Sequence, residues 1–289
     1  MSASVSPAGS EPTADAWARA AQPWGEFSRY GLLVLALLVG GVFAAALGCV
    51  TPSLEPSILH AGQARTAELP SEFELLSWNV HKQRDRRFNA ELLQFSTGVE
   101  LLLLQEATKA APVWTLQLEQ RIWTLVVAFV VGRDPLASGV ATASTADPVR
   151  HEPLLSASRE PVFCTPKSAL LTWIELEGTS SSLLLVNLHG INFRPAKALA
   201  AQLQQFDAAI AAHDGPLVVA GDFNTWSRRR RAVVEAFAKQ HRLVSPFREI
   251  IGRRLDNVYV RGLLIRSVEV LDSRSSDHDA LRVELSLPG

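Results

Sequence analysis

The sequence is poor in cysteine and has almost no excess charge. Only two cysteines, Cys49 and Cys164, occur in 289 residues. This number excludes a disulfide-rich scaffold, and each cysteine is expected to be a lone buried thiol. The formal net charge is -1. A general electrostatic attraction to nucleic acid is therefore excluded, and any polyanion has to be bound by a local basic cluster.

The sequence does contain a long uncharged apolar stretch, from residue 30 to residue 53. About 20 helical residues cross a hydrocarbon layer roughly 30 Å thick, so the stretch predicts one transmembrane helix. Charged residues among the first 29 favour a retained anchor over a cleaved signal peptide. Two alternatives stay open: a lipoprotein signal, which Leu47, Gly48 and Cys49 weakly resemble, and a buried core helix.

The apolar stretch divides the chain into four predicted segments. Residues 1–29 read as a flexible tail, 30–53 as the membrane anchor, 54–71 as a linker rich in proline, and 72–289 as a single globular domain. Arg19 and Arg29 precede the anchor and Arg65 follows it, which favours a cytoplasmic amino terminus. We therefore expect a single-pass protein of a bacterial inner or plasma membrane, with the globular domain periplasmic or extracellular.

The globular segment alternates short aliphatic runs with polar residues, and its hydrophobic content fits a chain with a sizeable core. Two stretches show helical periodicity, residues 195–212 and 228–240. This mixture predicts two packed sheets with helices outside. The predicted strands are 73–78, 100–104, 123–131, 139–143, 170–176, 183–188, 217–220, 258–260, 265–271 and 280–285.

Polar residues stand at the ends of several predicted strands, where separate segments can converge on one cleft. Asn79, Glu106 and His189 each follow a strand, and Asp222 and Asn224 follow another. The pair at positions 277 and 278, Asp-His, precedes the last strand. Carboxylates, amides and imidazoles together can hold a hard cation, bind phosphate and move protons.

Each of these residues also has a purely structural interpretation. Asn79 could close a turn, and Glu106 could be a surface carboxylate. Asp222 and Asn224 could cap the helix expected to begin near Ser227. Their joint occurrence favours a site.

Six short blocks hold these candidate residues: Ser77-Trp78-Asn79-Val80, Leu104-Gln105-Glu106, Asn187-Leu188-His189, Gly221-Asp222-Phe223-Asn224, Leu255-Asp256-Asn257-Val258 and Ser276-Asp277-His278. In order and rough spacing they resemble the endonuclease/exonuclease/phosphatase superfamily, which includes DNase I. The resemblance covers essentially the whole domain and looks closest to a little-characterised bacterial branch. It implies a four-layer α/β sandwich of two packed mixed sheets flanked by helices.

The resemblance also implies a bound metal ion. Glu106, supported by Asn79 and Asp277, would hold Mg²⁺ or Mn²⁺ through carboxylate and amide oxygens.

Roles in proton transfer and phosphate binding follow from the same resemblance. His278, oriented by Asp256, would accept a proton from the attacking water or polarise the phosphate. Asp222 is the rival candidate for activating the water. Asn224 and His189 would hydrogen-bond the non-bridging oxygens.

Basic residues supply the remaining candidates for substrate binding. Arg159 resembles a phosphate-contacting arginine of the DNase I branch. Arg228 and Arg229 open a run of four arginines, residues 228–231, directly after the Gly-Asp-Phe-Asn block. Positive charge is unfavourable at a helix amino terminus, so this placement suggests contact with a polyanion.

The sequence therefore predicts a metal-dependent phosphodiester hydrolase, acting as an endonuclease or exonuclease on nucleic acid. The alternative is a phospholipase C or phosphatase acting on lipid headgroups or small phosphate esters. A tethered binding module without catalysis is the third hypothesis. No protein partner is predicted.

Overall fold

The computed structural model describes residues 57–109, 120–131, 136–161, 164–247 and 255–289. The chain divides into two compact units, residues 1–50 and 51–289. The predicted tail and membrane anchor lie outside the described residues. Among the residues that are described, no helix is both long enough and apolar enough to cross a membrane.

Seven strands form the larger sheet, in the order β1-β4-β5-β3-β2-β12-β11. Only β2 and β3 run parallel among its described pairs, so the sheet is mixed. Its strands are β1 (Ser57–Gly62), β2 (Glu72–Asn79), β3 (Leu101–Thr108), β4 (Ile122–Val131), β5 (Leu136–Ser144), β11 (Leu264–Leu271) and β12 (Ala280–Ser286).

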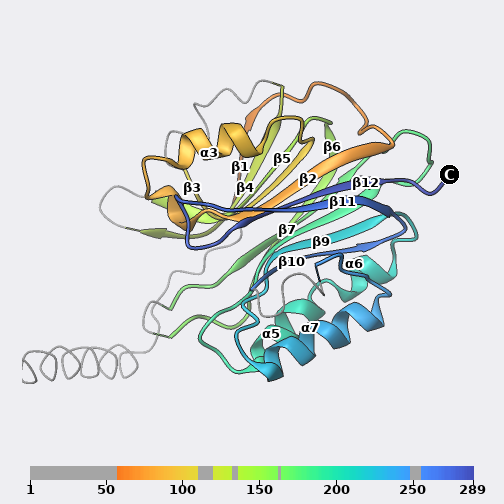
Figure 1. Ribbon diagram of the computed structural model, residues 1–289. Coiled ribbons are helices and arrows are strands. Elements are labelled where there is room, and N and C mark those ends of the chain that lie inside the picture. Colours follow the sequence, from red (N-terminus) through yellow and green to blue (C-terminus); the bar gives the residue numbers. More distant parts are fainter. Residues whose placement is uncertain (1–56, 110–119, 132–135, 162–163, 248–254) are drawn as a thin grey trace, which may run out of the picture. The chain divides into compact units, whose positions relative to one another are not determined.

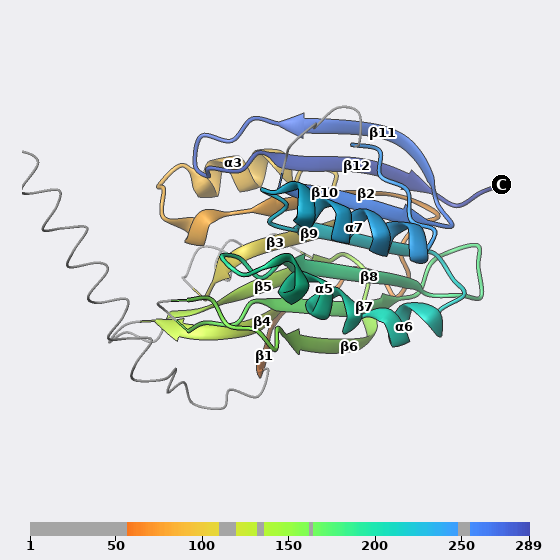
Figure 2. The same ribbon diagram turned by 90° about the horizontal axis from the view of Figure 1, so that it is seen from below.

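Five strands form the second sheet, in the order β10-β9-β8-β7-β6 (Figure 2). Here β8 and β9 run parallel. The strands are β6 (Pro148–Leu155), β7 (Ser168–Ile174), β8 (Leu183–His189), β9 (Leu217–Asp222) and β10 (Asp256–Arg261). The helices are η1 (His81–Gln83), α3 (Phe88–Phe95), α5 (Ala196–Gln204), α6 (Asp207–Ala211) and α7 (Arg228–Gln240).

The two sheets pack face to face and helices cover their outer faces, which gives four layers (Figure 1). Successive side chains of a strand point to opposite faces. Leu75 and Leu103 therefore join the core between the sheets, whereas Leu76 and Leu104 pack with α3. Strands buried on both faces explain the continuous aliphatic runs in the sequence.

The prediction of two packed mixed sheets with outer helices is confirmed. All ten predicted strands are present, and α7 has the predicted bounds. The helix expected over residues 195–212 is divided into α5 and α6. The prediction missed β1, β6 and α3. Residues 54–71 were expected to form a linker, yet β1 pairs with β4 along its whole length and Leu69 is fully buried.

Cys164 corrects a further expectation. It is disulfide-bonded and therefore not a lone thiol. Cys49, the other cysteine of the sequence, lies outside the described residues.

A partly buried histidine between the sheets makes the stability of the domain dependent on pH. His151 lies between the hydroxyls of Thr124 and Thr172, at 3.2 Å from each. Burial, and then the charge of His60, lower its pKa from 6.5 to about 4, although Asp147 acts in the opposite direction. Below pH 6.5 the unfolded chain therefore binds more protons at this position than the folded chain.

We expect the free energy of unfolding to fall as the pH drops from about 6.5 to about 4, and His151→Gln to reduce this loss. Urea unfolding of both proteins at pH 7 and pH 5 measures the difference. Equal losses of stability in the parent and the variant would show that His151 does not contribute.

Candidate active site

Parallel strands bring four of the predicted residues to one end of the two sheets. Asn79 ends β2 and Glu106 lies near the end of β3, which runs parallel to β2. His189 and Asp222 end the parallel strands β8 and β9 and are paired in register. The Asn79 amide donates to Asp222 Oδ2 at 3.2 Å, so this contact joins the two sheets.

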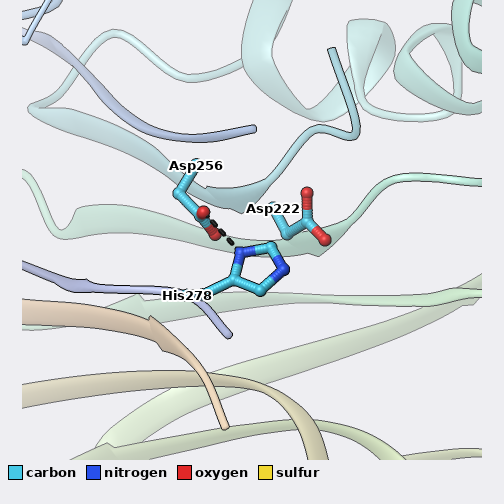
Figure 3. A group of neighbouring side chains, drawn as sticks. All are labelled: Asp222, Asp256 and His278. Atoms are coloured by element: carbon cyan, nitrogen blue, oxygen red, sulfur yellow. Dashed lines mark hydrogen bonds and ion pairs between the residues drawn. The ribbon is translucent and has the colours of Figure 1, made fainter. Parts of the chain in front are cut away.

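Asp222, Asp256 and His278 form the centre of the site (Figure 3). They come from the end of β9, the start of β10 and the loop before β12. One potential ligand atom from each lies within 4.8 Å of the others. Asp256 Oδ2 is 2.6 Å from His278 Nδ1, which orients the imidazole ring and leaves its Nε2 for other contacts.

The charges of this cluster shift the pKa values of its members. Burial alone would lower the pKa of His278, but the hydrogen bond to Asp256 and the charges of Asp256, Asp222 and Asp277 outweigh it and raise the pKa to about 9. Burial, and then the charge of Asp256, raise the pKa of Asp222 to about 7. The cluster therefore combines a proton donor with a carboxylate more basic than usual.

The Gly-Asp-Phe-Asn block has a backbone that fixes Asp222 and Asn224. Gly221 has a φ of 140°, and a Cβ there would lie 1.9 Å from the carbonyl oxygen of Leu188. Asn224 has a φ of 52°, and its backbone N–H donates to Asp222 Oδ1 at 2.8 Å. Its side-chain amide donates to the carbonyl of Gly190 at 2.9 Å. A left-handed asparagine is uncommon and is found often at functional sites.

Glu106 lies beside two lysines. Lys82 Nζ is 2.5 Å from one carboxylate oxygen, and Lys167 Nζ is 3.8 Å from the other. Lys167 is buried and also pairs with Glu160 at 3.3 Å. Glu106 and Lys82 both have positive φ values, of 53° and 58°. The turn over residues 81–83 therefore places the Lys82 ammonium directly beside the Glu106 carboxylate.

A small pocket lies at this position, lined in part by Lys82, Glu106, Phe129, Lys167 and His189. Burial, and then the charges of Lys167, His278 and Lys82, hold the pKa of His189 well below its usual value. His189 is therefore neutral near pH 7. Its Nε2 lies 3.5 Å from Asp222 and 4.0 Å from Glu106.

The loop that carries His278 is held from two sides. Ser276 Oγ donates to the carbonyl of Asn79 at 2.6 Å, and the Trp78 indole donates to the carbonyl of His278 at 3.0 Å. On the other side, Glu91 of α3 accepts hydrogen bonds from the backbone and side chains of residues 273–275, over distances of 2.7–3.2 Å. Glu91 therefore positions His278 without contacting it.

We expect Glu91→Ala to lower phosphoester hydrolysis about tenfold, because the loop loses its hydrogen bonds on one side while the imidazole itself is kept. Glu91→Gln should restore part of the activity, since its amide oxygen still accepts. Steady-state rates with thermal unfolding of both variants check this. Unchanged rates in Glu91→Ala would remove the positioning role.

Asp277 is not part of the central cluster. Its side chain is 66% exposed and lies 3.3 Å from His81 Nδ1. Its role as a metal ligand stays a prediction.

The predicted arginines have different surroundings. The Arg159 guanidinium donates to the carbonyl of Cys164 at 3.4 Å. Arg228 and Arg229 are exposed, whereas Arg230 is 1% exposed and bonded to backbone carbonyls. The run is thus not one continuous basic surface. Ser227 caps α7 by accepting from the backbone of Arg230, so Asp222 and Asn224 are not its caps.

Sequence reasoning missed Lys82, Lys167 and Glu91. Lys82 follows the first block by only two residues, so the sequence already placed a basic residue close to the predicted site. Lys167 lies outside the six blocks that carry the resemblance. Glu91 is separated from residues 273–275 by more than 180 positions, so no local pattern could have identified it.

The chain is similar to a known protein family and to several solved structures. A model described as the endonuclease/exonuclease/phosphatase family matches residues 76–278. A solved endonuclease/exonuclease/phosphatase from Beutenbergia cavernae is similar, with a TM-score of 0.62 and 15% identity over 75% of this chain and 72% of that one.

Two other solved structures share the fold, one with a bound DNA product and one named as a sugar phosphatase. D. rerio TDP2, complexed with a single-strand DNA product, has a TM-score of 0.54 and 13% identity over 75% of this chain and 99% of its own. A mannosyl-6-phosphatase from Bacteroides thetaiotaomicron has a TM-score of 0.53 and 14% identity over 74% and 100%. At these identities the likeness shows the fold alone. The family model covers more than half of the sequence, and the chain therefore belongs to the endonuclease/exonuclease/phosphatase family.

Proposed function

We propose that this chain is a divalent-metal-dependent phosphodiester hydrolase whose substrate is nucleic acid. Members of its family are generally hydrolases of phosphoester bonds. The observation that carries the proposal is the buried cluster of Asp222, Asp256 and His278, joined to Asn79 across the two sheets. A binding module would have no need for paired buried carboxylates around a charged imidazole.

The side chains present fit a hard divalent cation. Glu106 and Asn79 offer oxygen ligands at adjacent strand ends, and Asp222 lies within hydrogen-bond distance of Asn79. Lys82 and Lys167 already neutralise the Glu106 carboxylate. A bound cation would take the place of the Lys82 ammonium on this carboxylate. Glu106 and Asn79 would hold Mg²⁺ or Mn²⁺, with Asp277 as a further predicted ligand, and the bound ion would neutralise charge on the phosphate.

The remaining side chains supply proton transfer and phosphate binding. Asp222 lies beside Asn79 and His189 and accepts a proton from the attacking water. His278, held by Asp256 through Nδ1, polarises the phosphate through Nε2, and exchanging these two roles is the alternative assignment. His189 and Asn224 both lie close to Asp222 Oδ2 and stabilise charge on the non-bridging oxygens.

Similar structures and exposed arginines bear on the group that flanks the phosphate. The D. rerio relative carries a single-strand DNA product, and the Bacteroides relative is a mannosyl-6-phosphatase. Exposed Arg228 and Arg229 favour a substrate with several phosphates. Small phosphate esters and lipid headgroups are the alternative.

Residues 30–53 would attach the enzyme to a bacterial membrane as a single-pass anchor, with the catalytic domain periplasmic or extracellular. The length and apolar character of residues 30–53 support this attachment.

Turnover of a substrate panel by the full-length chain tests the proposed function. The panel is single-stranded DNA, plasmid DNA, structured RNA, sphingomyelin vesicles and bis-p-nitrophenyl phosphate, each with Mg²⁺ and with EDTA. We expect metal-dependent cleavage of nucleic acid and of the small diester. Turnover of sphingomyelin or the small diester without nucleic acid would support the alternative function. Inactivity on all five would favour the binding module.

A further inference from the structure

Two aromatic side chains are exposed beside the site. Phe193 is 70% exposed and Trp226 is 54% exposed. Phe193 follows His189 by four residues, and Trp226 follows Asn224 by two. Both therefore lie in loops that leave the carboxyl ends of the neighbouring parallel strands β8 and β9. Large exposed aromatic rings lose favourable burial, so two beside a reaction centre require an explanation.

Trp226 is exposed but held in a fixed orientation. Its indole N–H donates to Asn192 Oδ1 at 3.0 Å, which ties it to the residue before Phe193. The Arg230 guanidinium carbon lies 5.4 Å from the indole ring centroid. Arg230 is itself buried, because its guanidinium donates to the backbone carbonyls of Asn224, Arg194 and Ile191. A bland alternative is that the indole only shields Arg230.

Exposed positive charge follows Trp226 directly in the sequence. Arg228 and Arg229 occupy the first turn of α7 and are exposed. No acidic residue lies in that turn, where the helix dipole opposes positive charge. Shielding of Arg230 explains neither these arginines nor Phe193. An anionic ligand with flat apolar groups explains both features.

We propose, on the basis of the proposed function, that Phe193 and Trp226 form a stacking platform for the bases of single-stranded nucleic acid beside the scissile phosphate. Arg228 and Arg229 contact the phosphates of the same strand. Base faces are available in a single strand and hidden in a duplex, which makes the single strand the fitting partner. A fixed indole with a polar partner suits stacking better than insertion into lipid.

Binding of a fluorescein-labelled ten-nucleotide oligothymidylate, followed by anisotropy in EDTA to prevent cleavage, tests the platform. We expect Trp226→Ala and Phe193→Ser each to weaken binding about tenfold, and Trp226→Phe to restore most of the affinity. Arg228→Ala should reduce the dependence of affinity on salt concentration by about one phosphate contact. Val149→Ser is the matched control, because Val149 is 59% exposed on β6, and its affinity should equal that of the parent.

Three results would overturn the platform: unchanged oligothymidylate affinity in Trp226→Ala, equal weakening in Trp226→Phe, or stronger binding to a duplex of the same length. Tighter binding to vesicles of anionic phospholipid, lost in Trp226→Ala, would also overturn it and assign the rings to a membrane.

Hydrolysis of bis-p-nitrophenyl phosphate separates this proposal from the proposed function. Turnover of the diester without any effect of Trp226→Ala on the oligonucleotide refutes the platform alone. Platform-dependent binding without any phosphodiester turnover refutes the hydrolase alone.

Discussion

We expect His278→Ala to lower kcat for phosphodiester hydrolysis about 1000-fold, within the range found for loss of a hydrogen-bond donor that stabilises charge in the transition state. The imidazole is the part of the cluster that can donate a proton to the phosphate, and its Nδ1 is already held by Asp256. The backbone contacts of this loop, Trp78 to the His278 carbonyl and Ser276 to Asn79, do not depend on the ring. The fold should therefore persist.

Rates under saturating substrate, measured beside thermal unfolding, check this expectation. His213→Ala is a suitable control, because His213 contacts the carbonyl of Pro216 just before β9 begins, away from Asp222 at the end of that strand. The control should keep its rate within about twofold, as expected for a histidine outside the site. A loss of less than about tenfold in His278→Ala would remove His278 from the set of side chains that act on the phosphate.

Replacing Glu106 with glutamine weakens Mn²⁺ binding by at least about tenfold, because an anionic oxygen ligand becomes a neutral amide. The change also leaves Lys82 and Lys167 without their shared carboxylate, so the pocket gains positive charge. Both effects disfavour a cation. Electron paramagnetic resonance of free Mn²⁺ in a titration measures the affinity without relying on activity.

Two further variants sharpen this test. Glu152→Gln changes the same residue type in an exposed ion pair with Arg150 and should bind Mn²⁺ as the parent does. Lys82→Met removes the ammonium that occupies Glu106 and should strengthen binding. If Glu106→Gln retained the parent affinity, the metal site would have to lie elsewhere, and the Asp222, Asp256 and His278 cluster would be the next candidate.

The parts of the fold that follow from local pattern were predictable. The run Leu101–Leu104 is buried on both faces of a sheet, and such strands are continuous and aliphatic. Helix α7 begins after Ser227, a residue that caps helices well. Strand β1 escaped prediction because it lies at a sheet edge, where half-exposed residues leave no clear alternation. A chain beginning at residue 72 would lack this strand.

The site was predictable where residues follow strands and unpredictable where distant segments meet. Asn79, His189 and Asp222 end buried strands, so parallel pairing brings them together. The contact of Lys82 with Glu106 depends on the left-handed turn at residues 81–83. This turn contains no glycine, so the sequence does not indicate it. In the sequence Phe193 is an ordinary apolar residue, and only its exposure in the fold, 70%, separates it from the core.

We propose that this domain hydrolyses phosphodiesters with a bound divalent cation. The most direct test is the rate of bis-p-nitrophenyl phosphate hydrolysis by the full-length chain, before EDTA, after EDTA and after excess Mg²⁺ is restored. We predict a rate that is lost with EDTA and recovered with Mg²⁺. A rate that EDTA leaves unchanged would contradict the account.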